Sequence, residues 1–394
     1  MTKLAFVAPW FGTGIPGGAE AECRETARKL HEAGYPVEIL TTCVREFHSD
    51  WSRNHHRPGV EDWGGIPVRR FKVQKRDVRT FDQINHRLMN GRPISPEEEE
   101  VFIREMLRCD DLIAFIRANR DQYIFIHIPY MFTTSYLGTL AAPDRTLLIP
   151  CLHDESYAYL GIYRTMFEQA RGLIFNAKAE QVLADKLFRL REGTGIVLGA
   201  GIDTEFQSQP ARFKEKYRLN NYLLYAGRKD EGKNVPLLVD YFCRYKRLYP
   251  SDLQLVMVGS GQVPIPEEHQ HEVIDLGFVS AQDKYDAYGG AVALCQPSRN
   301  ESFSIVMMEA WVAGSPVLVH EECEVTRDHC LASNGGLFFA SFSDFVGTVD
   351  YLLQNPAQRQ RMAENGKRYV MANYAWDRMV EKYRATLEGW GISF

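Results

Sequence analysis

The sequence predicts an α/β protein made of two doubly wound, Rossmann-like domains. Short apolar runs such as Lys3–Pro9 and Tyr123–Ile128 alternate with amphipathic helical stretches, a pattern typical of parallel sheets covered by helices. The alternation starts again at Tyr222–Ala226, after a stretch of glycine and polar residues, Gly199–Phe206. A chain of 394 residues is long enough for two such domains.

Composition and charge indicate an ordinary globular protein. The chain has 45% hydrophobic and 25% charged residues and a net charge of −5, so no nucleic-acid partner is expected. It has no apolar run of about 18 residues, and its start is typical of a strand and not of a signal peptide. The eight cysteines include no CxxC pair, which indicates reduced thiols and a cytoplasmic location. Cys323, His329 and Cys330 fit no standard zinc spacing, so no metal is expected there.

The first domain begins with a strand, a loop, a helix and a strand. We expect the helix at about Ala19–Ala33 and the second strand at Val37–Thr42. Residues 44–100 are expected to be less regular, and a helix capped by Ser95 should run to about Asn119. The later strands of this sheet are predicted at Tyr123–Ile128, Thr146–Leu152, Gly172–Asn176 and Gly195–Leu198.

Two histidines stand at the ends of predicted strands, His127 in HIPY and His153 in HDES. The carboxyl ends of parallel strands line the ligand crevice in open α/β sheets, so both are candidates for chemistry. A histidine near a strand is also often a buried core residue, and that alternative stays open for both.

The loop after the first strand contains Gly12, Gly14 and Gly17, which spell G-x-G-x-x-G. This fingerprint favours an alternative function, a dinucleotide-dependent oxidoreductase. The fingerprint also needs an acidic residue at the end of the second strand, where this chain has Thr42 and Cys43. A tight turn between strand and helix is a further interpretation of the same loop.

A basic stretch with interleaved aromatic residues lies between residues 69 and 92. It could rest on an anionic membrane or hold a lipid-diphosphate acceptor. A solvated loop balanced by Glu97–Glu100 explains it equally simply, and we favour that reading. The basic residues are Arg69, Arg70, Lys72, Lys75, Arg76, Arg79, Arg87 and Arg92.

The second domain contains two groups of candidate ligand-binding residues. Arg228 and Lys233 follow the strand Tyr222–Ala226 in GRKDEGKN, where two fixed cations could clamp a diphosphate. Glu301 and Glu309 stand eight residues apart, before and within a predicted helix. Because the first N–H groups of a helix carry partial positive charge, the Phe303–Val306 end is a natural phosphate seat. A phosphate seat with a carboxylate on each side suits a sugar nucleotide.

The E-x7-E pattern followed by EAWVAGSPVLV resembles the signature of glycosyltransferase family 4, whose members are retaining enzymes with the GT-B fold. The resemblance implies two Rossmann-like domains that face each other across a cleft. It implies an acceptor domain at 1–205, a nucleotide-sugar domain at 206–374, and a final helix at about 375–394 that packs back on the first domain.

The resemblance also implies roles for single residues. His127 matches the histidine beside the donor sugar, and His153 matches a second strand-end histidine. Arg228 and Lys233 match the diphosphate ligands, Glu301 the sugar ligand and Glu309 the ribose ligand. The remaining implied contacts are Gly17 and Gly18 near the diphosphate and acceptor, Gly277, Phe278 and Val279 at the base, and Phe303, Ser304, Ile305 and Val306 at the phosphates.

The implied function is transfer of a hexose from a UDP-sugar such as UDP-glucose, favoured over a GDP-sugar, to a glycan or lipid-linked acceptor in polysaccharide or glycoconjugate synthesis. No metal or other cofactor is expected, and peripheral contact with the inner face of a membrane would follow if the 69–92 stretch binds lipid. Two departures from the family pattern, His320–Glu322 and the serines around Phe303, leave the donor open. A nucleotide-sugar-binding protein without catalysis is the third possibility.

Overall fold

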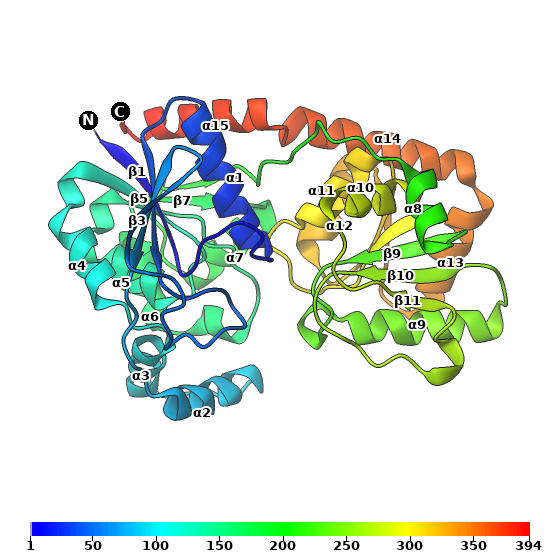
Figure 1. The fold of residues 1–394 in the computed structure, drawn as a ribbon, viewed down its shortest axis with the longest axis horizontal. Coiled ribbons are helices and arrows are strands. Elements are labelled where there is room, and N and C mark those ends of the chain that lie inside the picture. Colours follow the sequence, from blue (N-terminus) through cyan, green and yellow to red (C-terminus); the bar gives the residue numbers. More distant parts are fainter. Residues whose placement is uncertain (1) are drawn as a thin grey trace. The chain divides into compact units, whose positions relative to one another are not determined.

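The structure is a computed structural model that describes residues 2–394, and it divides into two compact units (Figure 1). Unit 1 runs to Gly201 and resumes at Met379, and unit 2 is Ile202–Arg378. The division therefore falls slightly before residue 205 and slightly after residue 374, the limits expected from the sequence. Within residues 2–394, no helix combines the length and the apolar character needed to cross a membrane.

Unit 1 contains an eight-stranded sheet with the order β3-β4-β2-β1-β5-β6-β7-β8. Neighbouring strands are parallel except β3 and β4, which form a hairpin around Gly64 and Gly65. The strands are β1 Lys3–Ala8, β2 Val37–Thr42, β3 Gly59–Trp63, β4 Ile66–Phe71, β5 Tyr123–His127, β6 Thr146–Leu148, β7 Gly172–Phe175 and β8 Gly195–Val197.

Helices cover both faces of this sheet, which is why β1 and β5 are almost continuously apolar. Figure 1 shows α4 and α5 on one side of β1 and β5, and α1 on the other. The helices of unit 1 are α1 Gly18–Glu32, α2 Val78–Met89, α3 Pro96–Met106, α4 Asp110–Ala118, α5 Thr133–Ala141, α6 Ile162–Gln169, α7 Lys178–Leu187 and, mostly beyond residue 378, α15 Trp376–Gly389.

Unit 2 contains a six-stranded, fully parallel sheet with the order β11-β10-β9-β12-β13-β14. The strands are β9 Tyr222–Ala226, β10 Gln254–Val258, β11 Val273–Asp275, β12 Ala293–Gln296, β13 Val317–His320 and β14 Gly336–Phe339. The helices are α8 Pro210–Tyr217, α9 Val235–Leu248, α10 Ala281–Gly290, α11 Ile305–Ala313, α12 Glu324–Ser333, α13 Phe342–Gln354 and α14 Pro356–Asn373.

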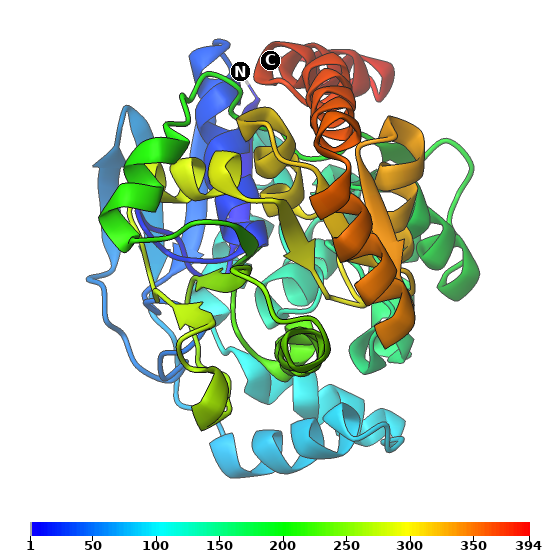
Figure 2. The same ribbon diagram turned by 90° about the vertical axis from the view of Figure 1, so that its right-hand side faces the viewer.

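One hydrophobic core of unit 2 lies between its sheet and two helices, α9 and α13. Phe242 of α9 and Phe345 of α13 are fully buried against Leu223 and Leu255 of the strands. In Figure 2, α9 is seen end on below the sheet. Strand order reverses between β9 and β12, so this point is the topological switch of the sheet, where ligands bind in open α/β folds.

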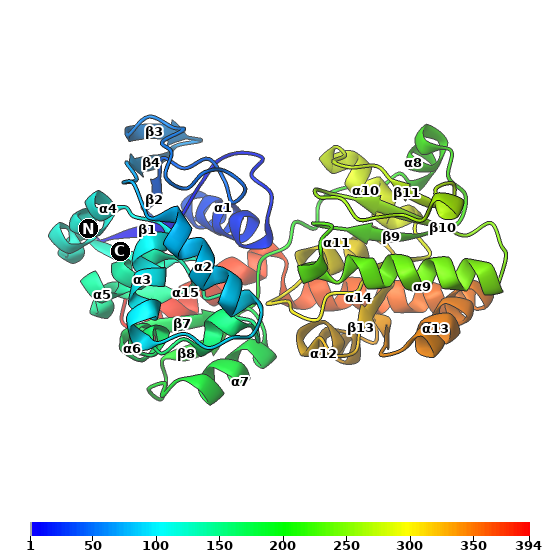
Figure 3. The same cartoon turned by 90° about the horizontal axis from the view of Figure 1, so that it is seen from below.

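The stretch from 44 to 119 differs from the sequence prediction in two ways. Residues 44–100 contain the β3–β4 hairpin and α2, which lies beside α3 (Figure 3). The long helix predicted from Ser95 is broken between α3 and α4, because the Leu107 N–H donates to Thr133 Oγ1 (3.2 Å). Cys109 Sγ likewise donates to the Lys72 carbonyl (3.4 Å), so contacts from distant residues replace the helical bonds.

Residues 379–394 belong to unit 1. Lys382 Nζ donates to the Leu198 carbonyl (3.3 Å), and Trp390 Nε1 donates to the Gly193 carbonyl (3.2 Å). The Trp390 indole also lies over Gly172, where an added Cβ would be 2.7 Å from the ring. This end of the chain is therefore fixed to the edge of the unit 1 sheet.

Candidate active site

The loop after β9 carries Arg228 and Lys233 and is held firmly at the carboxyl edge of the unit 2 sheet. Asp230 pairs with the Arg228 guanidinium and accepts from the Lys233 N–H (2.9 Å). Lys229 is almost completely buried, with Nζ bonded to Asp275 Oδ1 (2.5 Å) and to the Gly259 carbonyl (2.8 Å). These bonds attach the loop to the ends of β10 and β11, so the backbone that carries Arg228 and Lys233 is held in place.

Lys233 and Glu301 come from separate segments and meet at the switch point. Lys233 Nζ lies 2.7 Å from Glu301 Oε1, and Gln296 Nε2 at the end of β12 donates to the same oxygen (2.8 Å). The Glu301 side chain is only 10% exposed. The structure thus brings together two residues that the sequence predicted separately, and it adds Gln296 to them.

The N-terminus of α11 lies a few residues after Glu301 in the sequence. Its cap residue Ser304 has a φ of +71° and makes no side-chain capping bond, and its hydroxyl has no partner among residues 2–394. The N–H groups at Ile305 and Val306 therefore keep the unpaired donor capacity of a helix start. The Phe303 side chain instead packs on Tyr374 (ring centroids 4.9 Å apart), so any ligand contact at Phe303 falls to its backbone.

Glu309 lies on the second turn of α11 and is held from α10. Lys284 Nζ bonds Glu309 Oε1 (2.8 Å), and the Tyr288 hydroxyl donates to Oε2 (2.9 Å). Burial, together with this carboxylate, raises the pKa of Tyr288 and keeps its hydroxyl a donor. Lys284 and Tyr288 were missed in the sequence, although their i,i+4 spacing would have placed them on one helix face.

The loop after β11 presents the predicted base-binding segment Gly277–Val279. Gly277, with a φ of +62°, donates to Asp275 Oδ1 (2.9 Å), and its carbonyl accepts from the Gly259 N–H (2.8 Å). Phe278 follows with 67% of its surface exposed. The loop is fixed by its backbone while the phenyl ring stays accessible.

In unit 1, Gly17 and Gly18 stand at the start of α1. Gly17 has a φ of +132°, and an added Cβ would lie 1.9 Å from Glu20 Oε2. The Glu20 carboxylate also accepts from Trp10 Nε1 (2.8 Å). Glycine is therefore required at 17, whereas the space around Gly18 is open.

His127, the last residue of β5, is fully buried, and burial lowers its pKa to about 3. Neither ring nitrogen has a hydrogen-bond partner within residues 2–394, and Gly138 of α5 lies directly against the ring. A ring with no exposed surface cannot touch a bound sugar unless the surrounding chain moves, so its contact with the donor stays a prediction. His153 is partly exposed and lies 3.4 Å from Glu155 Oε1.

Part of the basic stretch is paired with carboxylates within unit 1. Arg69 bonds Glu38 (2.9 Å), Arg70 bonds Glu61 (2.7 Å), and Arg87 pairs with Glu98. Arg76 stacks over the rings of Trp51 and Phe81.

The glycine loop lacks the ribose partner of a dinucleotide site. At the end of β2 the Thr42 hydroxyl donates to the Pro9 carbonyl (2.6 Å), where the fingerprint needs a carboxylate.

All eight cysteines are buried free thiols. Across residues 2–394, no group of three His, Cys, Asp or Glu side chains is placed to hold a metal ion.

Known proteins that are similar to this chain include glycosyltransferases. Residues 206–369 match the family model described as Glycosyl transferases group 1. An uncharacterized glycosyltransferase of Methanocaldococcus jannaschii is 28% identical, over 99% of this chain and 100% of the relative. A D-inositol 3-phosphate glycosyltransferase of Kineococcus radiotolerans is 23% identical, over 96% of this chain and 91% of the relative.

Among solved structures, Anabaena HepE in complex with UDP superimposes with a TM-score of 0.71 at 14% identity, covering 98% of this chain and 100% of that one. A likeness of this extent shows a shared fold, and two Rossmann-like units with parallel sheets are the GT-B fold. The chain is thus similar to group 1 glycosyltransferases in its second half and to glycosyltransferases over almost its whole length.

Proposed function

We propose that the protein is a retaining hexosyltransferase that needs no metal and transfers a hexose from a UDP-sugar to a glycan or lipid-linked acceptor. The observation that supports this most directly is the Lys233–Glu301 contact of 2.7 Å at the switch point of unit 2. It joins a cation suited to a diphosphate with a carboxylate suited to sugar hydroxyls, beside the unpaired N-terminus of α11.

In this proposal, the side chains of the site change their hydrogen-bond and ion-pair partners when the donor binds. Lys233 moves from Glu301 to the diphosphate, and the freed Glu301 carboxylate accepts from hydroxyls of the sugar. Arg228 and the first turn of α11 add positive charge, while Glu309 accepts from the ribose hydroxyls in place of the Tyr288 or Lys284 bond. Fixed positive charge aimed at a leaving group whose charge grows is usually a large catalytic term.

The reaction proposed is a substitution on one face of the sugar. The bond between C1 and the diphosphate oxygen breaks, and the acceptor oxygen bonds C1 from the same side. The acceptor proton passes to a diphosphate oxygen, so no protein carboxylate acts as nucleophile. Because Arg228, Lys233 and the helix end supply the charge, the reaction is expected to proceed in the presence of a chelator.

Two comparisons support the substrate classes. The structural neighbour HepE was solved with UDP, and the curated relative of Kineococcus radiotolerans is named for D-inositol 3-phosphate, a polyhydroxylated acceptor. We extend the UDP donor and a polyhydroxylated acceptor to this chain as part of the proposal.

The first test measures UDP, GDP, UDP-glucose, GDP-mannose and NADH binding by calorimetry, and then hydrolysis and transfer with the nucleotide sugar that binds. Lys233→Ala and Glu301→Gln should each lower kcat by about 10²–10³, the usual loss when one preorganised group is removed. Arg247→Ala is the matched control, because Arg247 lies in the last turn of α9, at the opposite end from Lys233.

Three other outcomes would each contradict part of the proposal. Binding of NADH alone would replace the proposal with an oxidoreductase. Nucleotide-sugar binding without turnover, towards water or any acceptor tried, would indicate a binding protein. Loss of activity with a chelator, restored by a divalent cation, would contradict the metal-independent mechanism.

A further inference from the structure

A pocket of about 340 Å³ opens in unit 1 at the carboxyl ends of β1, β2 and β4, and no role in the proposed donor chemistry uses it. Its wall is formed by the loop after β1, the loop after β2 and the β3–β4 hairpin, so we call it the hairpin pocket. The residues that carry the argument are Phe11, Thr13, His56, Asp62, Trp63 and Arg70.

Arg70 is the buried polar group of the hairpin pocket. It is 5% exposed, with Nε bonded to Glu61 Oε1 (2.8 Å) and Nη2 bonded to the Phe11 carbonyl (3.0 Å). Its Nη1 is buried and has no partner among residues 2–394. A guanidinium donor that is removed from water without a partner is costly, so a ligand that accepts from Nη1 would regain that energy.

His56 supplies a second unsatisfied group. Its Nε2 is buried and lacks a partner in the described part of the chain, while its backbone N–H donates to the Cys43 carbonyl (3.0 Å). Burial, and then the charge of Arg70, lower the pKa of His56. The neutral ring can donate or accept through Nε2, as a sugar hydroxyl can.

Aromatic rings form another side of the hairpin pocket. Phe11 and Trp63 meet edge to face with centroids 5.0 Å apart, and Trp63 Nε1 donates to Thr13 Oγ1 (3.1 Å). Flat aromatic surface beside a few directed polar groups is the usual composition of a small-molecule site. The C–H face of a sugar ring packs well on such a surface.

The charges that line the hairpin pocket cancel. Arg70 is paired with Glu61, and Arg45 with Glu46 (2.9 Å), while Asp62 accepts from the Gly65 N–H (3.2 Å). An anionic ligand would meet Glu61 and Asp62, whereas a neutral ring with hydroxyl groups would find donors and acceptors together. The volume is near the lower end of ligand pockets, which suits one monosaccharide unit.

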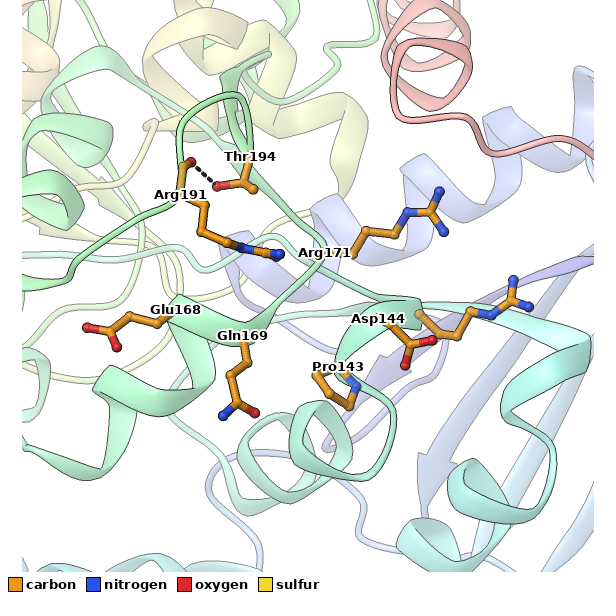
Figure 4. Close-up of a pocket in the computed structure, with 8 residues that line it drawn as sticks. Pro143, Asp144, Glu168, Gln169, Arg171, Arg191 and Thr194 are labelled. Atoms are coloured by element: carbon orange, nitrogen blue, oxygen red, sulfur yellow. Dashed lines mark hydrogen bonds between the residues drawn. The ribbon is translucent and has the colours of Figure 1, made fainter.

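A second cavity, of about 750 Å³, is less suited to a ligand (Figure 4). Two of its three arginines already have partners, since Arg171 donates to the Trp390 carbonyl (2.5 Å) and Arg191 to the Ala170 carbonyl (2.6 Å). The Thr194 hydroxyl donates to the Arg191 carbonyl, and Glu168 and Arg171 point in opposite directions. The cavity also lies at the amino ends of the strands, away from the ligand edge of the sheet.

We propose that the hairpin pocket binds one neutral hexose unit of the acceptor, and that the chain covering Arg70 Nη1 and His56 Nε2 shifts so that both atoms bond to its hydroxyls while Trp63 packs against its C–H face. This inference rests on the proposed transferase function, because it assigns the acceptor of that reaction to unit 1. It identifies the acceptor as a neutral glycan terminus.

The test is saturation-transfer NMR of the full chain with methyl α-glucoside, methyl α-mannoside, methyl α-galactoside and, separately, inorganic phosphate. At least one glycoside should bind, and Trp63→Ala and His56→Leu should each weaken it tenfold or more. His55→Leu is the matched control, since His55 is exposed and does not line the pocket. Melting temperature and UDP titration on each variant show whether its fold is retained.

Glu301→Gln separates this inference from the proposed function, because it should lower the rate of transfer by about 10²–10³ and leave glycoside binding intact. If the protein binds no nucleotide sugar but binds glycosides through Trp63, the proposed transferase function is wrong. The proposed sugar site in the hairpin pocket would then still stand. Normal donor binding with no glycoside signal, or with a signal unchanged in Trp63→Ala and His56→Leu, would overturn the pocket. Phosphate binding lost in His56→Leu, without glycoside binding, would replace the sugar with an anion.

Discussion

Glu22 of α1 is a carboxyl group buried in the interior of unit 1. Its Oε2 accepts from Asn176 Nδ2 (2.9 Å), and Cys151 Sγ lies 3.8 Å from the same oxygen. Burial raises its pKa to about 8, although the bond from Asn176 acts in the opposite direction. At neutral pH the folded protein therefore holds this group protonated, while the unfolded chain ionises it.

The sign of the resulting pH dependence follows from linkage. The stabilising contribution of Glu22 is complete below about pH 4.5, declines as the pH rises, and is lost once the pH passes about 8. Glu22→Gln should remove this decline, which has a slope of at most about 1.4 kcal/mol per pH unit. Urea unfolding of the wild type and of Glu22→Gln from pH 5 to 9 measures this slope. Parallel curves for wild type and variant would show that Glu22 is already ionised in the fold.

At the residue scale, the sequence predicted which charged residues lie at one edge of the unit 2 sheet better than it predicted how deeply side chains are buried. Lys233 and Glu301 were predicted from two local motifs and lie in contact, because each motif follows a strand of the same sheet edge. The burial of His127 depends on Gly138, and that of the Phe303 ring on Tyr374. Such contacts come from distant parts of the chain, and no local pattern encodes them.

At the scale of elements, α11 and α14 pack closely against each other at Trp311 and Gly366. Trp311 is fully buried and donates from Nε1 to the Gly335 carbonyl (2.8 Å), and Gly366 of α14 lies against its ring. A Cβ at 366 would fall 2.2 Å from Trp311 Cδ1. The close approach of the two helices therefore depends on a glycine in the middle of α14.

Gly366→Ala should lower the free energy of unfolding by about 1–3 kcal/mol through overpacking. Gly347→Ala in α13 is the paired control, because a Cβ there meets no atom within 4 Å and alanine favours the helix by up to about 1 kcal/mol. Opposite shifts of the urea midpoint are expected for the two variants. A stabilised Gly366→Ala protein would show that α14 can move away from Trp311 at no cost.

The sequence predicted elements well where apolar periodicity was strong and poorly where tertiary contacts decide. The strands β1, β2, β5 and β9 lie where the pattern placed them, since buried parallel strands are rich in apolar residues. The break between α3 and α4 was missed, because the Leu107 N–H is satisfied by Thr133, a residue far along the chain.

At the scale of the whole molecule, unit 1 is built from two separate parts of the chain. Leu387 of α15 is 1% exposed in unit 1, whereas Arg384 on the same helix is exposed. Leu387→Ala should destabilise unit 1 by about 2–5 kcal/mol. Hydrogen exchange read by mass spectrometry should show faster exchange in residues 2–201 and little change in 202–378.

Arg384→Ala provides the comparison for Leu387→Ala and should leave exchange in both units as in the wild type. If Leu387→Ala raised exchange equally in both units, the division of the chain into two compact units would not correspond to two units of stability.

The split of unit 1 has a consequence during protein synthesis. Domains usually fold in the order in which the ribosome releases them. Here the strands of unit 1 emerge first, but residues 379–394 follow only after the whole of unit 2. At roughly 5–20 residues per second, translating residues 202–378 takes about 10–35 seconds. During that interval the apolar surface that Tyr383 and Leu387 later cover is open to solvent, so we expect the first half of the nascent chain to be prone to aggregation.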